Sequence, residues 1–384
     1  MKIKVAFTTV AVAAAMVSTS AIADIKIGLV GPLTGGSAPF GVSASAGAKL
    51  AVAEINKAGG INGEQIVLIE RDDEAKPERG PLIVQEFAAE KVVAITGFTN
   101  TGVTRPSAKV AQDAGIPLMI NVSAGSGIPA EYSGAEVNYI FRVTGHDGFA
   151  SKRMAEYVSN KFGKNAKVAL MGDTTAYGQG GVKDVTAAMA QHGMTPSVIE
   201  KFNIKDTDMT AQVLRAKQAG VQVIVSYGIG PELAALAKTM KKLGFKVPLV
   251  VSWGGGLDSF VKLAGAENAE GVVVPLSFIQ SNITNAKQKK FVADYQAAYK
   301  VKDIPFASSA AQGYDAMYIL AEGIRQAKTK DGKDIVRALE NLNTKVNGVV
   351  TTYDKPFTKA THEAFWATLL QMTVWKNGQL VLDK

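Results

Sequence analysis

The residues that could do chemistry gather in two short polar segments, 97–102 (GFTNTG) and 121–126 (NVSAGS). Each follows an apolar run, and each offers hydroxyl groups and backbone N–H groups that small side chains leave uncovered. Ligands of open α/β sheets bind outside the carboxyl ends of the strands, and the N-terminus of a following helix favours an anion. One such segment alone more often caps a helix and turns the chain. Because there are two in succession, we expect a site for a small carboxylate.

The sequence lacks the common motifs of enzymes and metal sites. The chain contains no GxxxxGK[ST] phosphate loop, no GxSxG elbow and no HExxH zinc motif. It has no cysteine, which excludes disulfides, iron–sulfur clusters and thiolate zinc sites, and its three histidines are far apart in sequence. The pair Asp72–Asp73 is more typical of a loop or a helix cap than of acid–base catalysis. We therefore expect a protein that is not an enzyme and holds neither cofactor nor metal.

The first 23 residues have the pattern of a secretory signal peptide. Lys2 and Lys4 precede a 13-residue apolar run, and Ala21-Ile22-Ala23 is a small-x-small cleavage site before Asp24. The apolar run is shorter than the about 20 residues that a membrane-spanning helix needs. No cysteine is present to carry a lipid anchor. We expect cleavage after Ala23 and a soluble periplasmic protein, with an uncleaved N-terminal anchor as the alternative.

The charge does not indicate a nucleic-acid partner. The 384-residue chain carries 42 Lys and Arg against 34 Asp and Glu; removing residues 1–23, with two lysines and no acid, leaves a net charge of +6. The basic residues are dispersed, whereas nucleic-acid sites cluster them along one face. A diffuse basic surface is compatible with an anionic ligand or a membrane partner.

Short apolar runs alternate with helical segments along the mature chain. Strands are expected at residues 26–31, 65–71, 92–96, 118–122, 167–171, 221–226, 247–253 and 271–275. Near-continuous apolar runs are typical of parallel strands buried on both faces, and their alternation with helices predicts right-handed βαβ units. The predicted fold class is therefore α/β, with doubly wound sheets.

The number of strands favours two lobes over one sheet. Breaks near residues 139–145, 271–275 and 348–354 would let the chain pass three times between the lobes, which makes a three-stranded hinge. The expected first lobe comprises residues 24–143 and 273–349. The expected second lobe comprises residues 144–272 and 350–384.

Several motifs carry a resemblance to a known family. They are IGLVGPLTG at 27–35, AEINKAGGING at 53–63, AGIPL at 114–118, YGQG at 177–180 and GYDA at 313–316. With them the chain resembles the periplasmic solute-binding proteins of the branched-chain amino-acid ABC transporter family, across essentially all of its mature length. The resemblance implies a type I periplasmic binding fold, whose two Rossmann-like lobes close on a small solute and present it to a permease.

The resemblance also implies a set of binding residues. Hydroxyl and backbone N–H groups of the first lobe would hold the carboxylate of the ligand, with aromatic side chains nearby. Carried over by motif, the carboxylate-binding positions are Asn100, Thr101, Ser123, Ala124 and Gly125. The aromatic positions are Phe40 and Tyr177.

One departure from the family bears on the ligand. Amino-acid binders of this family use a second-lobe glutamate to balance the ligand ammonium, and that position falls on or beside Trp253. A second tyrosine of those binders falls near Ile229, with Tyr227 two residues away. A buried ammonium without a counter-charge is costly. We therefore expect a small monocarboxylate with an apolar or aromatic body, bound by a pocket that includes Tyr227 and Trp253.

Alternatives to this interpretation stay open. Trp253 could be a core residue at a strand end, its ring could attract a cation, and a small shift in alignment would bring Asp258 into the site. Each of the last two keeps an amino acid as ligand. The expected partners are an inner-membrane ABC permease with its ATPase, with the binding protein a monomer; a periplasmic sensor receptor is the alternative partner.

Overall fold

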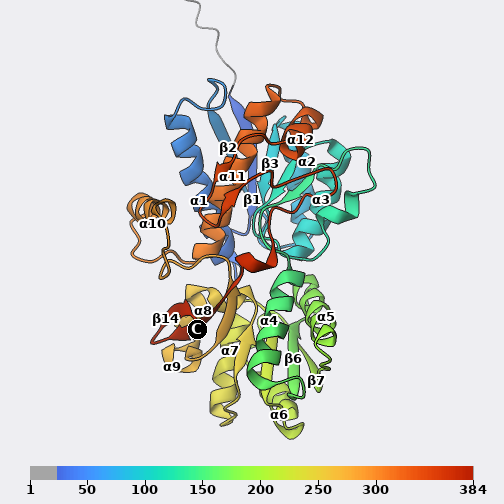
Figure 1. Ribbon diagram of the computed structural model, residues 1–384, viewed down its shortest axis with the longest axis vertical. Helices are drawn as coiled ribbons and strands as arrows, with labels where there is room; N and C mark the ends of the chain where they lie inside the picture. The colour runs from blue at the N-terminus through green and yellow to red at the C-terminus, as the bar shows by residue number, and fades with distance from the viewer. Residues whose placement is uncertain (1–23, 384) are drawn as a thin grey trace, which may run out of the picture.

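The computed structural model describes residues 24–383, which form two α/β lobes stacked along the long axis of the molecule (Figure 1). The predicted signal peptide, residues 1–23, lies outside the described residues. Within residues 24–383, no helix is both long and apolar enough to cross a membrane. The fold class expected from the sequence is confirmed.

The first lobe is built on a five-stranded parallel sheet with strand order β2-β1-β3-β4-β5. The strands are β1 (Ile25–Gly31), β2 (Ile66–Asp72), β3 (Ala94–Gly97), β4 (Leu118–Ile120) and β5 (Ile140–Arg142). One helix group is α1 (Ala38–Lys57), α11 (Ala307–Ala327) and α12 (Gly332–Glu340); a second is α2 (Arg79–Ala89) and α3 (Thr101–Ala114). Helix α10 (Ala286–Tyr299) packs beside α1.

Helices α1 and α11 approach each other closely because glycines face backbone at their crossing. A Cβ atom on Gly47 of α1 would overlap the carbonyl oxygen of Ala310, and one on Gly313 of α11 would overlap the carbonyl oxygen of Ala44. The two helices are about 265 residues apart in sequence, yet both are central to one core. The first lobe is therefore assembled from two distant stretches of chain.

The second lobe is built on a seven-stranded sheet with strand order β14-β13-β10-β9-β8-β6-β7. Strands β6 (Val168–Asp173), β7 (Val198–Phe202), β8 (Val223–Tyr227), β9 (Leu249–Val251) and β10 (Val273–Leu276) are parallel. Strands β13 (Gln371–Lys376) and β14 (Gln379–Leu382) are an antiparallel addition at one edge. The main helices of this lobe are α4 (Asp147–Phe162), α5 (Ala176–Gln191), α6 (Thr210–Gln218), α7 (Gly230–Lys242) and α8 (Asp258–Ala264), with the one-turn α9 (Ala266–Ala269).

Two of the expected lobe boundaries differ from the structure. Residues 273–276 were expected in the first lobe, but as β10 they pair with β9 and β13 of the second sheet. Residues 350–364 were expected in the second lobe, but Tyr353, Phe357 and Ala364 are buried in the core of the first. Their anchor is Asp315 of α11, which accepts hydrogen bonds from the amides of Val349 and Val350 and from the Tyr353 hydroxyl.

The structure thus places three crossings between the lobes at residues 143–146, 277–285 and 365–370. The first lies between β5 and α4, the second between β10 and α10, and the third leads from the first-lobe core into β13. From here on, the first lobe means residues 24–142 and 286–364, and the second lobe residues 147–276 and 371–383.

Candidate functional site

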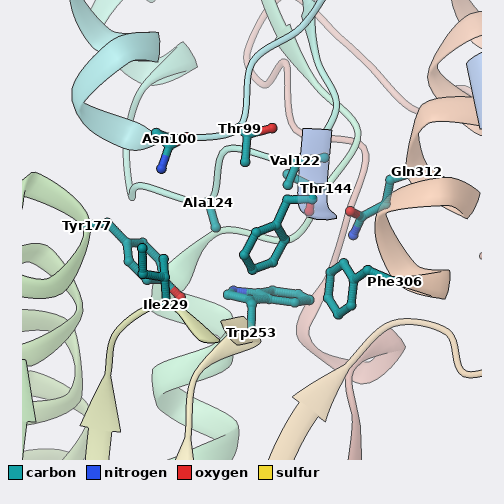
Figure 2. A pocket seen from close by; sticks show the side chains of 11 residues that line it. Thr99, Asn100, Val122, Ala124, Thr144, Tyr177, Ile229, Trp253, Phe306 and Gln312 are labelled. Carbon is teal, nitrogen blue, oxygen red and sulfur yellow. The ribbon is translucent and has the colours of Figure 1, made fainter. Parts of the chain in front are cut away.

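A cavity lies between the two lobes, at the carboxyl ends of β3 and β4 on one side and of β8 and β9 on the other. Figure 2 shows its lining residues converging from both lobes. The lining residues are Phe40, Thr99, Asn100, Val122, Ala124, Thr144, Tyr177, Ile229, Trp253, Phe306 and Gln312. No charged side chain is among these described lining residues.

The first-lobe end of the cavity carries polar groups without partners. Thr101, at the start of α3, is buried, and neither its Oγ1 atom nor the Oγ atom of buried Ser123 has a hydrogen-bond partner in the structure. Asn100 donates through Nδ2 to the Ser37 hydroxyl at 3.0 Å, which leaves its Oδ1 unpaired. Unpaired buried polar groups are uncommon in folded proteins, and a binding site is one reason for them.

The two polar segments are packed directly against each other. The Ser123 amide donates to the Phe98 carbonyl at 3.0 Å, and Phe98 adopts a left-handed φ of 61° at the end of β3. A Cβ atom on Gly125 would overlap the side chain of Thr101, so only glycine fits there. Within the described residues, the amides of Ala124, Gly125 and Ser126 donate to no protein acceptor. This end of the cavity therefore presents free hydrogen-bond donors.

The opposite end of the cavity is aromatic and apolar. The rings of Phe40 and Phe306 meet edge to face with centroids 4.9 Å apart. Trp253 is 6% exposed, and its ring lies between Ile229 and Phe306 (Figure 2). A small apolar or aromatic ligand body would be enclosed here on several sides.

The sequence-predicted site residues fall into three groups. Phe40, Asn100, Ala124, Tyr177 and Trp253 line the cavity, whereas Thr101, Ser123 and Gly125 form the layer directly behind it. Tyr227 does not line it: the side chain is 1% exposed, and its hydroxyl contacts Ser151 Oγ at 3.0 Å. Its ring packs behind Tyr177, with centroids 5.5 Å apart, so Tyr227 supports the cavity wall.

Six lining residues were not among the predicted positions. Thr99 and Val122 belong to the two polar segments, so the predicted positions beside them in sequence could have indicated them. Ile229 and Thr144 follow strands, as ligand-binding residues of α/β sheets do. Phe306 and Gln312 come from the start of α11, where no motif marks them.

The carboxylate of Asp147 lies next to the cavity, behind its lining. Asp147 begins α4, is 1% exposed, and donates its amide to the Ala124 carbonyl at 2.6 Å. Burial, with the charge of Asp184, raises the pKa of Asp147 to about 7, although Arg142 and the Trp253 indole both lower it. Asp258, the other acid considered from the sequence, lines a separate groove and pairs with Lys262 at 2.5 Å.

Replacing Asp147 with asparagine is expected to change how stability depends on pH. Between its ordinary pKa of 3.8 and about 7, folded Asp147 keeps a proton that the unfolded chain releases. Its contribution to the free energy of unfolding therefore grows as the pH falls from 7 towards 4, by up to about 1.4 kcal/mol per pH unit. Urea unfolding at pH 5 and pH 8 should show that the free energy of unfolding of wild type, relative to that of Asp147→Asn, is higher at pH 5 than at pH 8. The same difference in free energy of unfolding between wild type and variant at both pH values would contradict this expectation. Asp113→Asn, a substitution at an exposed site, is the control.

Comparison with known proteins identifies the family. A family model described as periplasmic binding protein matches residues 24–378. The Leu/Ile/Val-binding protein homolog 3 of Brucella melitensis is 31% identical over 84% of this chain and 85% of its own.

Solved structures agree with that match. A type 1 periplasmic binding protein from Bordetella pertussis superposes with a TM-score of 0.84 at 30% identity, covering 94% of this chain and all of the other. A branched-chain amino-acid transporter substrate-binding protein from Streptococcus pneumoniae, solved with isoleucine, has a TM-score of 0.80 at 26% identity, covering 93% and 98%. The family and fold expected from the sequence motifs are confirmed: this chain belongs to the substrate-binding proteins of the branched-chain amino-acid ABC transporter family.

Proposed function

We propose that this protein captures a small monocarboxylate with an apolar or aromatic body between its lobes and delivers it to an ABC permease. The observation that carries the proposal is the division of the cavity into two unlike ends. One end offers unpaired hydroxyl and amide groups; the other is mainly aromatic, with the Tyr177 hydroxyl and the Trp253 indole N–H as its unpaired polar groups, and no charged side chain is among the described lining residues. A periplasmic sensor receptor stays the alternative to the permease as the recipient of the ligand.

The polar end suits a carboxylate. Ala124 lines the cavity; the donors around it are the free amides of residues 124–126 and, in the layer directly behind the lining, Thr101 Oγ1 and Ser123 Oγ. A buried donor left unpaired costs about 1–3 kcal/mol, and a ligand oxygen would remove that cost. The N-terminus of α3 adds its partial positive charge, which favours an anion by about 0.3–1 kcal/mol.

The described lining offers no carboxylate to an ammonium group, which in an α-amino acid would lie beside the ligand carboxylate. A zwitterionic amino acid would place its ammonium among side chains that carry no negative charge, and an unpaired buried charge is costly. The second candidate, a branched-chain amino acid, is favoured by the names of the relatives and by one feature of the site. Asp147 lies behind Trp253 and Ala124, from where its carboxylate could balance an ammonium through the wall.

A matched ligand panel separates the two candidates. Leucine, its deaminated analogue 4-methylpentanoate, phenylacetate and 4-methylpentanamide would each be titrated into the mature protein while the melting temperature is followed. A ligand that binds only the folded state raises this temperature, and at equal concentration the rise grows with the logarithm of its affinity. We expect the two acids to stabilise most and the amide to have no effect. A larger shift with leucine than with any deaminated acid would overturn the monocarboxylate proposal in favour of the amino acid.

Lobe closure is part of the proposed mechanism. Because residues of both lobes line the cavity, a ligand touching both binds the closed state better and shifts the population towards it. Small-angle scattering should show a smaller radius of gyration with saturating ligand. The same radius with and without a bound ligand would argue against closure.

Export through a cleaved signal peptide completes the proposal. The family is periplasmic, and cleavage after Ala23 would leave a monomeric protein that begins at Asp24. N-terminal sequencing of the exported protein should begin at Asp24. Recovery of an intact Met1 terminus in the membrane fraction would show an uncleaved anchor instead.

A further inference from the structure

Arg142, at the end of β5, is a fully buried arginine whose bonds converge on the polar end of the cavity. Its side chain has 0% exposure. Nη1 donates to the carbonyl oxygen of Gly125 at 2.7 Å and to that of Ser123 at 3.3 Å. Nε donates to Glu363 Oε2 at 2.8 Å, and Nη2 donates to the other oxygen of the same carboxylate. The Glu363 carboxylate thus balances the charge of the guanidinium, which also donates hydrogen bonds to two backbone carbonyls.

The two hydrogen bonds from Arg142 Nη1 orient the amides of the polar segment 121–126. In a trans peptide, the C=O and N–H groups point in opposite directions. With the carbonyls of Ser123 and Gly125 held by Arg142, the N–H groups of Ala124 and Ser126 point away from it. Neither amide has a protein acceptor among residues 24–383. A charged donor on the carbonyl also polarises the peptide, which makes its N–H a stronger donor.

Arg142 also joins the polar segment to the crossings. The Arg142 amide donates to the His362 carbonyl at 2.8 Å, and the Ala364 amide donates back to the Arg142 carbonyl at 2.9 Å. The third crossing therefore starts directly beside β5, from which the first crossing leaves. The first and third crossings also contact each other, because a Cβ atom on Gly145 of the first would lie 2.7 Å from the Phe365 ring of the third.

We propose that Arg142 is a positioning residue for ligand binding: it fixes the amides that receive the ligand carboxylate and connects them, through Glu363, to two of the three crossings. This inference rests on the proposed function in taking the polar end of the cavity as the carboxylate site. Arg142 itself does not touch the ligand, because the peptides of the polar segment lie between them.

The test compares Arg142→Lys with Arg215→Lys, a control at a half-exposed arginine that also forms a two-bond pair with a glutamate. Lysine keeps the charge but cannot donate in the fork geometry of arginine to both carbonyls and Glu363. The probes are 4-methylpentanoate or leucine, whichever the panel selects, each with its primary amide. Calorimetric titration gives the ratio of the two dissociation constants. Hydrogen exchange of segment 121–127 is measured in parallel without ligand.

We expect Arg142→Lys to reduce the preference for the acid over the amide at least 10-fold and to speed exchange of segment 121–127, with no change in the control. Glu363→Gln, which leaves the carbonyl bonds in place, should show a smaller effect in the same direction and serves if the lysine variant does not fold. An unchanged acid-to-amide ratio with unchanged exchange would overturn the role of Arg142. Failure of wild type to bind either acid would instead count against the proposed function, and the exchange measurement would then decide the positioning role alone.

Discussion

Replacing Trp253 with alanine is expected to weaken ligand binding by about 30-fold to several hundredfold while leaving the unliganded protein folded. Trp253 is the largest second-lobe side chain in the cavity lining and is 6% exposed. Central tryptophans in enclosed contacts typically contribute about 2–4 kcal/mol, and each 1.4 kcal/mol corresponds to a tenfold change in affinity. Calorimetric titration with the best ligand of the panel measures the loss directly.

The chain offers its own control for this experiment. Trp366 lies at the third crossing, is 45% exposed and is not part of the cavity lining, so Trp366→Ala should bind as wild type does. Trp253→Phe should recover part of the affinity, because it restores a flat ring at the same position. Wild-type affinity in Trp253→Ala would show that the second lobe does not cover the ligand, and the ring would then be a core residue at the end of β9.

Replacing Gly313 with valine is expected to lower the free energy of unfolding by more than about 3 kcal/mol, or to prevent folding of the first lobe altogether. The new side chain would meet the backbone of Ala44 in α1, and backbone cannot move aside as a flexible side chain can. Extra methylene groups forced into a well-packed core typically cost about 1–3 kcal/mol even where neighbours can adjust. Urea unfolding monitored by circular dichroism provides the measurement.

Gly180 in α5 is the matched control. It is also a helical glycine, but a Cβ atom there would meet nothing within 4 Å. Gly180→Ala should therefore stabilise the protein by about 0.5–1 kcal/mol, the ordinary helix preference for alanine. If Gly313→Val unfolded at the same urea concentration as wild type, the close packing of α1 on α11 would not be a determinant of stability.

Eight of the ten parallel strands among residues 24–383 were predictable, because burial on both faces leaves a continuous apolar run in the sequence. All eight expected strands are present, within a few residues at each end. The edge strands β5 and β7 were missed, because β5 has only three residues and the burial of β7 alternates. Strands β13 and β14 were also missed, since an antiparallel pair at a sheet edge is partly exposed and its sequence is more mixed. The lobe boundaries at 273 and 350 were misplaced because an apolar strand such as β10 could serve either lobe; only its pairing partners decide.

The candidate site was predictable where it is local in sequence and not where it depends on tertiary packing. The two polar segments indicated the first-lobe end of the cavity, because two of them in succession after buried strands favour a ligand site over a mere turn or helix cap. Phe306 enters from a helix near the end of the chain, and nothing in its neighbourhood indicates a ligand. The ring of Tyr177 lines the cavity, and the ring of Tyr227 packs behind it. The spacing of residues in the sequence does not determine which of two adjacent tyrosines faces the cavity.

The assembly of the first lobe from two distant stretches of chain has a consequence for how the protein folds. Residues 24–142 supply all five strands of its sheet, but α11 emerges from the ribosome only after the whole parallel part of the second lobe. Until then, the surface of α1 that packs on α11 has nothing to cover it. Contacts across some 265 residues are slow to form, because a long loop must close first. We therefore expect the first lobe to complete its fold only after most of the chain has been synthesised.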